Sequence, residues 1–296
     1  MASYGRSLEF FFVDGRPEGI LTAEVFNWTG HILKVPRTRI TEGLARREAS
    51  FTGVYLLLGD LDGKACAYVG EGEDVAARIK AHDVAKDWWT DVVIVTTSAN
   101  NLHKAHIKFL ESRIVELARN AGNVALENGN TPPRSSLSEA ARSNMEEFLD
   151  TLGIVLPALG IDLITSKKRA TIPAPESVVP VPAAEFRLEF LKENIVALAG
   201  LQDGEFVVRQ GSLARRAWVG SGDHNAGYRK LHSQLIESAV LMVNDHNAVF
   251  TTDYAFASPS AAAAVVLGRS ANGRTEWHLP NGTTYRDWEA AQLSDA

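Results

Sequence analysis

The chain contains 296 residues, of which 45% are hydrophobic, so it is long enough for two globular domains. Its formal net charge of −6 argues against a strong nonspecific nucleic-acid binder, because such proteins are usually basic. The single cysteine, Cys66, excludes an intrachain disulfide, and the lack of a signal-peptide pattern or membrane-length apolar stretch predicts a cytoplasmic protein without a membrane partner.

Residues 1–49 carry two short β-rich runs, LEFFFV and GHILKV, and we expect them to form a β-rich extension. This segment also holds a cluster of basic residues: Lys34, Arg37, Arg39, Arg46 and Arg47. Arg37 and Arg39 are candidate contacts for a polyanionic substrate. Ordinary solvated surface charge is the alternative interpretation of this cluster.

Residues 53–58 and 65–70 are predicted antiparallel strands, because two β-rich runs flank the turn residues 59–63. A turn centred between Leu61 and Asp62 would place Tyr55 directly opposite Tyr68. A two-residue loop would instead make the two phenols diagonal neighbours on one face, and a three-residue loop would separate them. Either of the first two registers brings both hydroxyls to one surface.

Two helices follow this hairpin. Over residues 73–86, Arg78 and His82 are four residues apart and share one helical face. Over residues 103–120, Glu111 lies within the apolar stripe, where a carboxylate is costly unless it is paired or bound to metal. A Glu at the edge of the stripe that reaches solvent or an arginine is the alternative.

A turn signal, Asn128-Gly129, follows the second helix. The ordered set Gly53-Val54-Tyr55, Tyr68-Val69-Gly70, Arg78, His82, Glu111 and Asn128 resembles the GIY-YIG nuclease family. Val54 and Val69 stand where the family name has isoleucine. The resemblance covers about residues 50–132, and we place this domain at residues 50–164, with a long trailing helix over 135–160.

The resemblance implies a small mixed α/β domain that hydrolyses a phosphodiester with one divalent metal, Mg²⁺ or Mn²⁺. It implies that Glu111 is the metal ligand and that Arg78 holds the scissile phosphate, for which a guanidinium fork is suited. Tyr55 would orient or deprotonate the attacking water, Tyr68 would support it, and Asn128 would shape the site. We also expect Gly70 to lie at the substrate.

The general base is open between two residues. A free phenol titrates near pH ~10, so Tyr55 needs help from a nearby positive charge to act as a base. The imidazole of His82 titrates nearer neutrality and is the competing base.

Residues 165–183 are proline-rich and are predicted to be an extended linker. Residues 184–296 are predicted to form an α+β domain, with strands at 205–209 and 249–252 and helices at 228–241 and from Pro259 to the Gly268 stop. This region resembles an uncharacterised domain that follows GIY-YIG and restriction-type modules, which implies DNA recognition, including recognition of modified bases. Arg269 and Arg274 are its candidate substrate contacts.

The sequence therefore predicts an α+β protein with a GIY-YIG-like nuclease domain and a C-terminal domain that guides it to DNA. Restriction or phage defence is the first expected setting, and DNA repair is the second. A double-strand break would need a homodimer or two successive nicks. The alternative is a noncatalytic nucleic-acid-binding protein that keeps the nuclease fold as a docking module, in keeping with the acidic balance.

Overall fold

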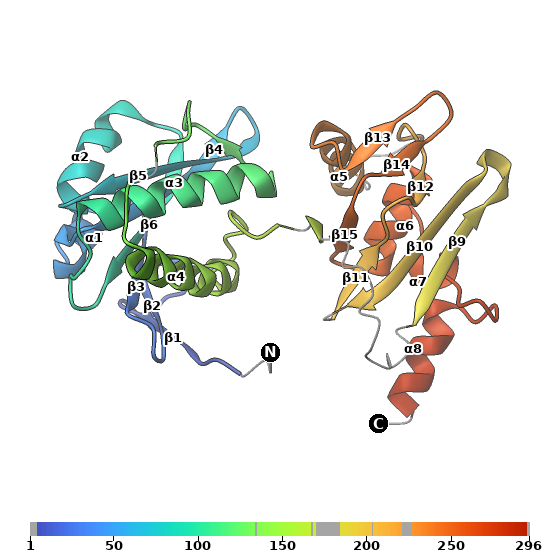
Figure 1. The fold of residues 1–296 in the computed structure, drawn as a ribbon, viewed down its shortest axis with the longest axis horizontal. Helices are drawn as coiled ribbons and strands as arrows, with labels where there is room; N and C mark the ends of the chain where they lie inside the picture. The colour runs from blue at the N-terminus through green and yellow to red at the C-terminus, as the bar shows by residue number, and fades with distance from the viewer. Residues whose placement is uncertain are drawn as a thin grey trace. The chain divides into compact units, whose positions relative to one another are not determined.

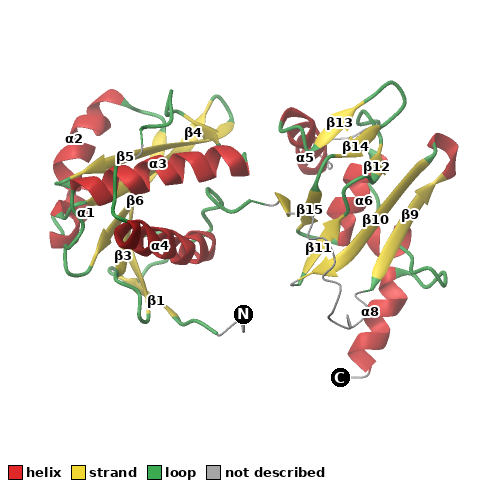
Figure 2. Ribbon diagram, in the orientation of Figure 1, coloured by secondary structure: helices red, strands yellow, loops and turns green. Residues whose placement is uncertain are grey.

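The computed structural model describes residues 5–133, 135–166, 168–169, 184–202, 204–220 and 226–294. The chain divides into two compact units, Met1–Ser166 and Lys167–Ala296 (Figure 1). Figure 2 shows that each unit combines helices with strands. The predicted α+β class is confirmed.

A seven-stranded sheet forms the centre of the first unit, in the order β1-β2-β3-β6-β4-β5-β7. Its strands are β1 (Leu8–Phe12), β2 (Leu21–Val25), β3 (Gly30–Pro36), β4 (Gly53–Leu61), β5 (Lys64–Gly72), β6 (Trp89–Thr97) and β7 (Ala125–Leu126). Neighbouring strands are antiparallel except β5 and β7. Because β3 pairs with β6 along its length, the segment 1–49 belongs to the same sheet as the hairpin that follows it.

Helices cover both faces of this sheet. One face packs against α2 (Val75–Ala85) and the short α1 (Ile40–Leu44), through a core that includes Leu57 and Ile79. The other face packs against α3 (Lys104–Ala121) and α4 (Glu139–Ala158). The short 3-10 turns Arg37–Arg39 and Arg47–Ser50 lie on either side of α1 in the chain.

Side chains at the helix ends explain where these helices begin. The Asp74 carboxylate accepts a hydrogen bond from the Ala77 backbone N–H at 2.9 Å, at the start of α2. The Ser138 hydroxyl does the same for Ala141 at the start of α4, so this helix begins at Glu139, four residues later than the sequence predicts. Gly122, in the left-handed region, ends α3.

The β4–β5 hairpin has a two-residue Asp62-Gly63 loop, in which both residues have positive φ, 55° and 75°. Tyr55 is therefore opposite Gly70, and Tyr68 is opposite Leu57. The prediction that the phenols are diagonal neighbours on one face is confirmed. Direct opposition of Tyr55 and Tyr68 is wrong, because the turn is centred between Asp62 and Gly63.

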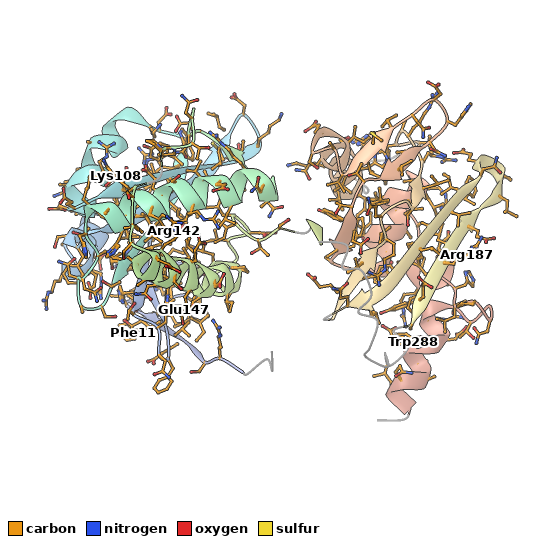
Figure 3. The ribbon with its side chains drawn as sticks, in the orientation of Figure 1. Phe11, Lys108, Arg142, Glu147, Arg187 and Trp288 are labelled. Carbon is orange, nitrogen blue, oxygen red and sulfur yellow. The ribbon has the colours of Figure 1, made fainter. Side chains whose placement is uncertain are left out.

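The edge strand β1 carries three exposed phenylalanines, and Phe11 is the most exposed of them at 58% (Figure 3). β1 stands first in the sheet order, so among the described residues it pairs with β2 on one side and with no strand on the other.

The second unit contains two sheets. The strands β8 (Lys168–Arg169), β15 (Asp253–Phe256), β11 (Glu205–Val208), β10 (Ile195–Gln202) and β9 (Glu185–Phe190) form the larger one, in that order. The smaller one consists of β12 (Leu213–Ala214), β14 (Ala248–Phe250) and β13 (Leu241–Val243). The helices are α5 (Ala226–Glu237), α6 (Pro259–Leu267), α7 (Gly273–Glu276) and α8 (Tyr285–Ser294), and a 3-10 turn spans Leu191–Glu193.

The elements of the second unit agree with the predicted ones in part. The helix from Pro259 to the Gly268 stop is confirmed as α6. The helix predicted over 228–241 instead ends at Glu237, and the apolar residues after it form β13. Within the predicted linker, Lys168–Arg169 pairs with β15, while residues 167 and 170–183 lie outside the described residues.

No helix in the described part of the chain has both the length and the apolar character needed to cross a membrane.

Backbone conformation at two glycines gives opposite expectations for substitution by alanine. Gly63→Ala should lower the free energy of unfolding by about 1 kcal/mol, because its φ of +75° suits glycine. Gly153→Ala should raise it by roughly 0.5 kcal/mol or more, because Gly153 lies within α4 and a Cβ there meets nothing within 4 Å. Urea unfolding of both variants measures the difference, and equal shifts of one sign would contradict the assigned turn.

Candidate functional site

The phenols of Tyr55 and Tyr68 and the guanidinium of Arg78 form one cluster on the α2 face of the sheet. The two phenol rings lie with their centroids 6.3 Å apart. The Arg78 guanidinium, near the start of α2, lies close enough to both phenols that its positive charge opposes the rise in their pKa. Tyr55 is fully buried, whereas Tyr68 is half-buried. Three residues from β4, β5 and α2 therefore meet as the sequence predicts.

Gly70 makes room for this cluster. A Cβ at position 70 would lie 2.5 Å from the Tyr55 hydroxyl oxygen and from its ring carbon Cζ. Gly70 is itself buried, opposite Tyr55 in the hairpin. In this arrangement its first role is to admit the phenol.

Burial decides the charge state of Tyr55. Removal from water raises the pKa of the Tyr55 phenol well above its usual range, and Tyr68 adds to the shift. The positive charge of Arg78 opposes the shift without cancelling it. Tyr55 is therefore a neutral hydroxyl near pH 7, able to donate and accept hydrogen bonds.

Glu111 projects from α3 at the edge of the same cluster. Burial and the nearby carboxylate of Glu71 raise the pKa of Glu111 to about 7, while Arg78 and two lysines, Lys104 and Lys108, oppose that shift. Glu111 in turn raises the pKa of Tyr55 and of Tyr68. The carboxylate is thus close enough to act electrostatically on both phenols.

Glu71 and Lys104 were not among the candidate residues that the sequence indicated. Glu71 lies in β5, opposite Val54. Both of its carboxylate oxygens accept hydrogen bonds from the Lys104 ammonium at 2.8 Å. No spacing in the sequence links these two residues, which are 33 positions apart.

Asn128 holds the strand that carries Tyr68. Its Oδ1 accepts a hydrogen bond from the Val69 N–H at 2.9 Å, and its Nδ2 donates to the Val69 carbonyl at 2.8 Å. The side chain is buried, and the Asn128 carbonyl itself accepts from Arg119 at 2.8 Å. Asn128 therefore supports the backbone between Tyr68 and Gly70.

Lys86 is a second residue that the sequence interpretation missed. Its ammonium lies 4.6 Å from the centroid of the Tyr68 ring and forms an ion pair with Glu127. His82 belongs to α2, four residues after Arg78, and its side chain lies outside the described residues.

The donor set suits one hard dication held mostly by water. Among the described residues, no group of three or more His, Cys, Asp or Glu side chains is arranged to hold a metal. Mg²⁺ can bind through one or two carboxylates and keep several waters. Glu111, with Glu71 nearby, fits this pattern, because a dication would offset the burial and the repulsion that raise its pKa.

The four arginines predicted to contact substrate already have partners within their own units. Arg37 donates to the carbonyls of Lys86 and Trp89 and lies over the Trp89 ring. Arg39 forms ion pairs with Asp14 and Glu42. In the second unit, Arg269 pairs with Glu276 and Arg274 with Glu289. None of the four lies among the groups that surround Arg78 as described above.

Removal of the Asn128 amide should destabilise the first unit. Asn128→Ala leaves the Val69 N–H and C=O without their partners, and we expect a loss of about 2–3 kcal/mol in the free energy of unfolding. Asn130→Ala, at an exposed position two residues later, is the matched control and should change it by less than about 0.5 kcal/mol. Equal losses in urea unfolding would contradict this role.

Glu111 should make stability depend on pH. Its folded pKa of about 7 lies above the ordinary value of 4.5, so its contribution is fully present below pH 4.5 and is lost as the pH rises through 7. In metal-free solution at pH 8, Glu111→Gln should therefore be more stable than the wild type, by about 1–2 kcal/mol after allowance for partial exposure. The advantage should shrink at pH 4.5, and a pH-independent difference in urea unfolding would contradict it.

Comparison with known proteins identifies a family in the second unit. The family described as Domain of unknown function (DUF4357) matches residues 187–289. No curated protein and no solved structure gives a significant match to the chain. The predicted uncharacterised domain in the C-terminal region is confirmed by this match.

Proposed function

We propose that the first unit is a metal-dependent endonuclease of the GIY-YIG type, which hydrolyses phosphodiester bonds in DNA. One observation carries this proposal. The Arg78 guanidinium lies beside two phenols, and the half-buried carboxylate of Glu111 acts electrostatically on all three groups. Their order in the chain is the order of the family resemblance.

Arg78 would bind the scissile phosphate. A guanidinium forms two parallel hydrogen bonds to phosphate oxygens and stays charged at any physiological pH. Phosphate would meet the Arg78 guanidinium beside the two phenols, as a hydrogen-bond donor already oriented from α2. Arg78 would then stabilise the negative charge that develops on the phosphoryl oxygens.

Glu111 would hold the divalent ion, with Glu71 as the nearby second carboxylate. When bound, Mg²⁺ or Mn²⁺ lowers the pKa of a coordinated water and neutralises charge on the leaving oxygen. The Lys104 ammonium would keep Glu71 in place beside Glu111 through the two hydrogen bonds at 2.8 Å.

The two candidate general bases differ in the free energy needed to form the species that accepts a proton. The raised pKa of Tyr55 makes its phenolate unfavourable, so its neutral hydroxyl is better suited to orient the attacking water. We therefore assign proton transfer to His82, because an imidazole ordinarily titrates nearer neutrality than a phenol. Tyr68 would hold Arg78 in position from the other side.

The organisation of the chain into two units supports a division between cleavage and target choice. We propose a cytoplasmic enzyme of restriction or phage defence, with DNA repair as the second setting, in which the C-terminal unit guides target choice. A homodimer would allow both strands of a duplex to be cut.

A noncatalytic nucleic-acid-binding protein is the second candidate. It is favoured by the internal partners of Arg37, Arg39, Arg269 and Arg274 and by the net charge of −6. Arg78 and Glu111 are both present, which favours the enzyme.

Cleavage of plasmid and single-stranded DNA with Mg²⁺ or Mn²⁺ tests the proposal. We expect metal-dependent cutting that falls at least about 100-fold in Glu111→Ala and in Arg78→Ala, because each removes a group that stabilises transition-state charge. Glu116→Gln on α3 and Lys80→Ala on α2 are matched controls and should keep most activity.

Two outcomes would contradict the proposal. Cutting that survives both Glu111→Ala and Arg78→Ala would mean that these residues are not the site. Salt-sensitive DNA binding with no cutting of either substrate would favour the noncatalytic protein.

A further inference from the structure

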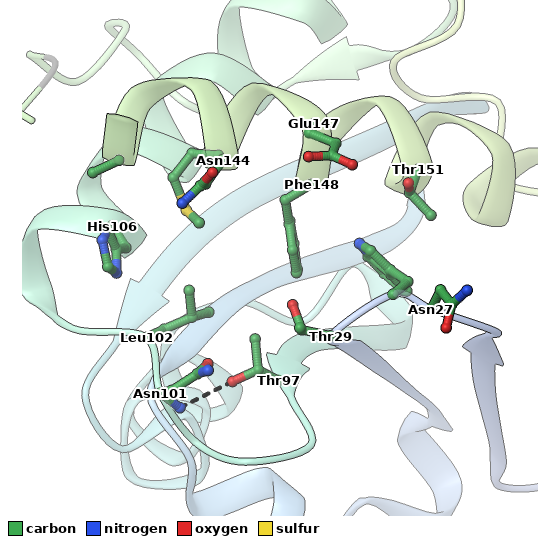
Figure 4. Close-up of a pocket in the computed structure, with 13 residues that line it drawn as sticks. Asn27, Thr29, Thr97, Asn101, Leu102, His106, Asn144, Glu147, Phe148 and Thr151 are labelled. Carbon is green, nitrogen blue, oxygen red and sulfur yellow. Dashed lines mark hydrogen bonds between the residues drawn. The ribbon is translucent and has the colours of Figure 1, made fainter. Parts of the chain in front are cut away.

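A polar cavity opens in the first unit, on the face of the sheet that packs against α3 and α4. It lies between the β2–β3 loop, the connection from β6 to α3, and α4 (Figure 4). Its volume of about 370 Å³ falls within the range of roughly 300–1,000 Å³ that small-molecule sites occupy. The residues that line it include Trp28, Asn101, His106, Asn144, Glu147 and Phe148.

Two buried nitrogen atoms of this cavity have no hydrogen-bond partner in the described part of the chain. They are Nε1 of Trp28 and Nδ1 of His106. A buried polar atom without a partner costs about 1–3 kcal/mol, so such atoms usually meet a ligand or water. The indole N–H can only donate, and it therefore calls for an acceptor on the occupant.

The side chains that line the cavity favour a neutral occupant over an anion. No lysine or arginine lines the cavity, whereas the exposed carboxylate of Glu147 projects from α4 at its rim (Figures 3 and 4). Burial and the neighbouring His103 lower the pKa of His106, so this imidazole is neutral near pH 7. Arg6 lies outside the lining and donates to the hydroxyl of Thr151, a lining residue, at 3.2 Å.

The walls suit a flat polar ring. The Trp28 and Phe148 rings pack with centroids 4.9 Å apart, and Asn101 and Asn144 add amide donors and acceptors. A Cβ at Gly30 would lie 2.2 Å from the Trp28 ring, so the glycine leaves space for the indole. The occupant should be neutral, planar, and carry both donors and acceptors on its edge.

We propose that this cavity binds a nucleobase with an exocyclic amino group, extruded from the DNA substrate. The amino group donates to the Glu147 carboxylate, and a ring nitrogen or carbonyl of the base accepts from the Trp28 indole. Enzymes that act on duplex DNA commonly read a base in this way, outside the stack. The origin of the base in a DNA substrate rests on the proposed nuclease function, whereas binding of a base in the cavity does not depend on it.

The cavity and the candidate site share one end of the sheet. The strands β3, β6, β4 and β5 are neighbours there, because Gly30 pairs with Thr97 and Gly53 with Gly72. Three inter-strand steps of about 4.8 Å separate β3 from β5, roughly 14 Å in all. The Asn100 side chain, next to the cavity, accepts from the Thr52 N–H at 3.0 Å. The phenol cluster lies on the α2 face and the cavity on the α3 and α4 face, so a nucleotide near the cleaved bond would reach the cavity around this end of the sheet.

A methylated ammonium group is the competing occupant, since it binds aromatic faces and carboxylates. The observations favour the base. Trp28 and Phe148 pack against each other and do not form a cage around a gap, and the unpartnered indole N–H needs an acceptor that an ammonium lacks.

Calorimetric titration of the full chain, without metal, against the four deoxynucleosides tests the proposal. We expect at least one of deoxyadenosine, deoxycytidine and deoxyguanosine to bind with a dissociation constant on the order of 1 mM, and thymidine, which lacks an exocyclic amino group, to bind at least about tenfold more weakly. Glu147→Gln should weaken binding about tenfold by removing a charge-assisted hydrogen bond.

Asp150→Asn is the matched control, because Asp150 is another exposed carboxylate of α4 that does not line the cavity. It should leave binding unchanged. Trp28→Phe keeps the ring and removes the N–H, and it should also weaken binding while the far-UV circular dichroism stays that of the wild type.

Any of three results would overturn the proposal: no nucleoside binds, thymidine binds as tightly as the others, or Glu147→Gln binds like the wild type. Preferential binding of a trimethyl-lysine peptide would assign the cavity to a different class of ligand. Because the titration involves neither metal nor cleavage, nucleoside binding without DNA cutting would reject the nuclease alone. DNA cutting without nucleoside binding would reject the cavity assignment alone.

Discussion

The register of the β4–β5 hairpin is the constraint on which the candidate site depends. The Asp62-Gly63 turn sets Tyr55 opposite Gly70, and it sets both phenols on the α2 face where Arg78 meets them. A slip of one residue in either strand would turn that strand's phenol toward α3 and α4. The space above Gly70 and the Asn128 clamp on Val69 both depend on the same pairing.

Within that frame, the electrostatics of the site balance burial against charge. Burial raises the pKa of Tyr55 and of Glu111, and Arg78 opposes both shifts. Glu71 pushes the pKa of Glu111 up, yet its own oxygens are held by Lys104. The negative charge of the Glu111 carboxylate is unfavourable in the free protein and would be favourable beside a cation, so this carboxylate is suited to bind a positively charged ligand. The same property makes the free protein sensitive to pH.

The sequence predicted the parts of the site that depend on local patterns. The turn signal, the two strands and the four-residue spacing within α2 are short-range features, and they explain why Tyr55, Tyr68 and Arg78 meet. Glu71 could not be placed, because a carboxylate just after a strand and before a helix suits either element. The partners of Arg37 come from residues about fifty positions away, and those of Arg39 include Asp14. The cavity combines the neighbourhoods of Trp28, Asn101 and Glu147, which only the tertiary fold brings together.

The two edges of the seven-stranded sheet differ in how they meet other chains. At one edge the Asn128 amide, which has the donor and acceptor of a peptide group, occupies the Val69 backbone just beyond the short β7. An incoming strand would have to displace that amide. At the other edge, β1 carries three exposed phenylalanines, and its outer side has no partner strand among the described residues. Self-association by strand addition would therefore be directional, beginning at β1 and leaving the edge that carries Tyr68 and Asn128 uncovered.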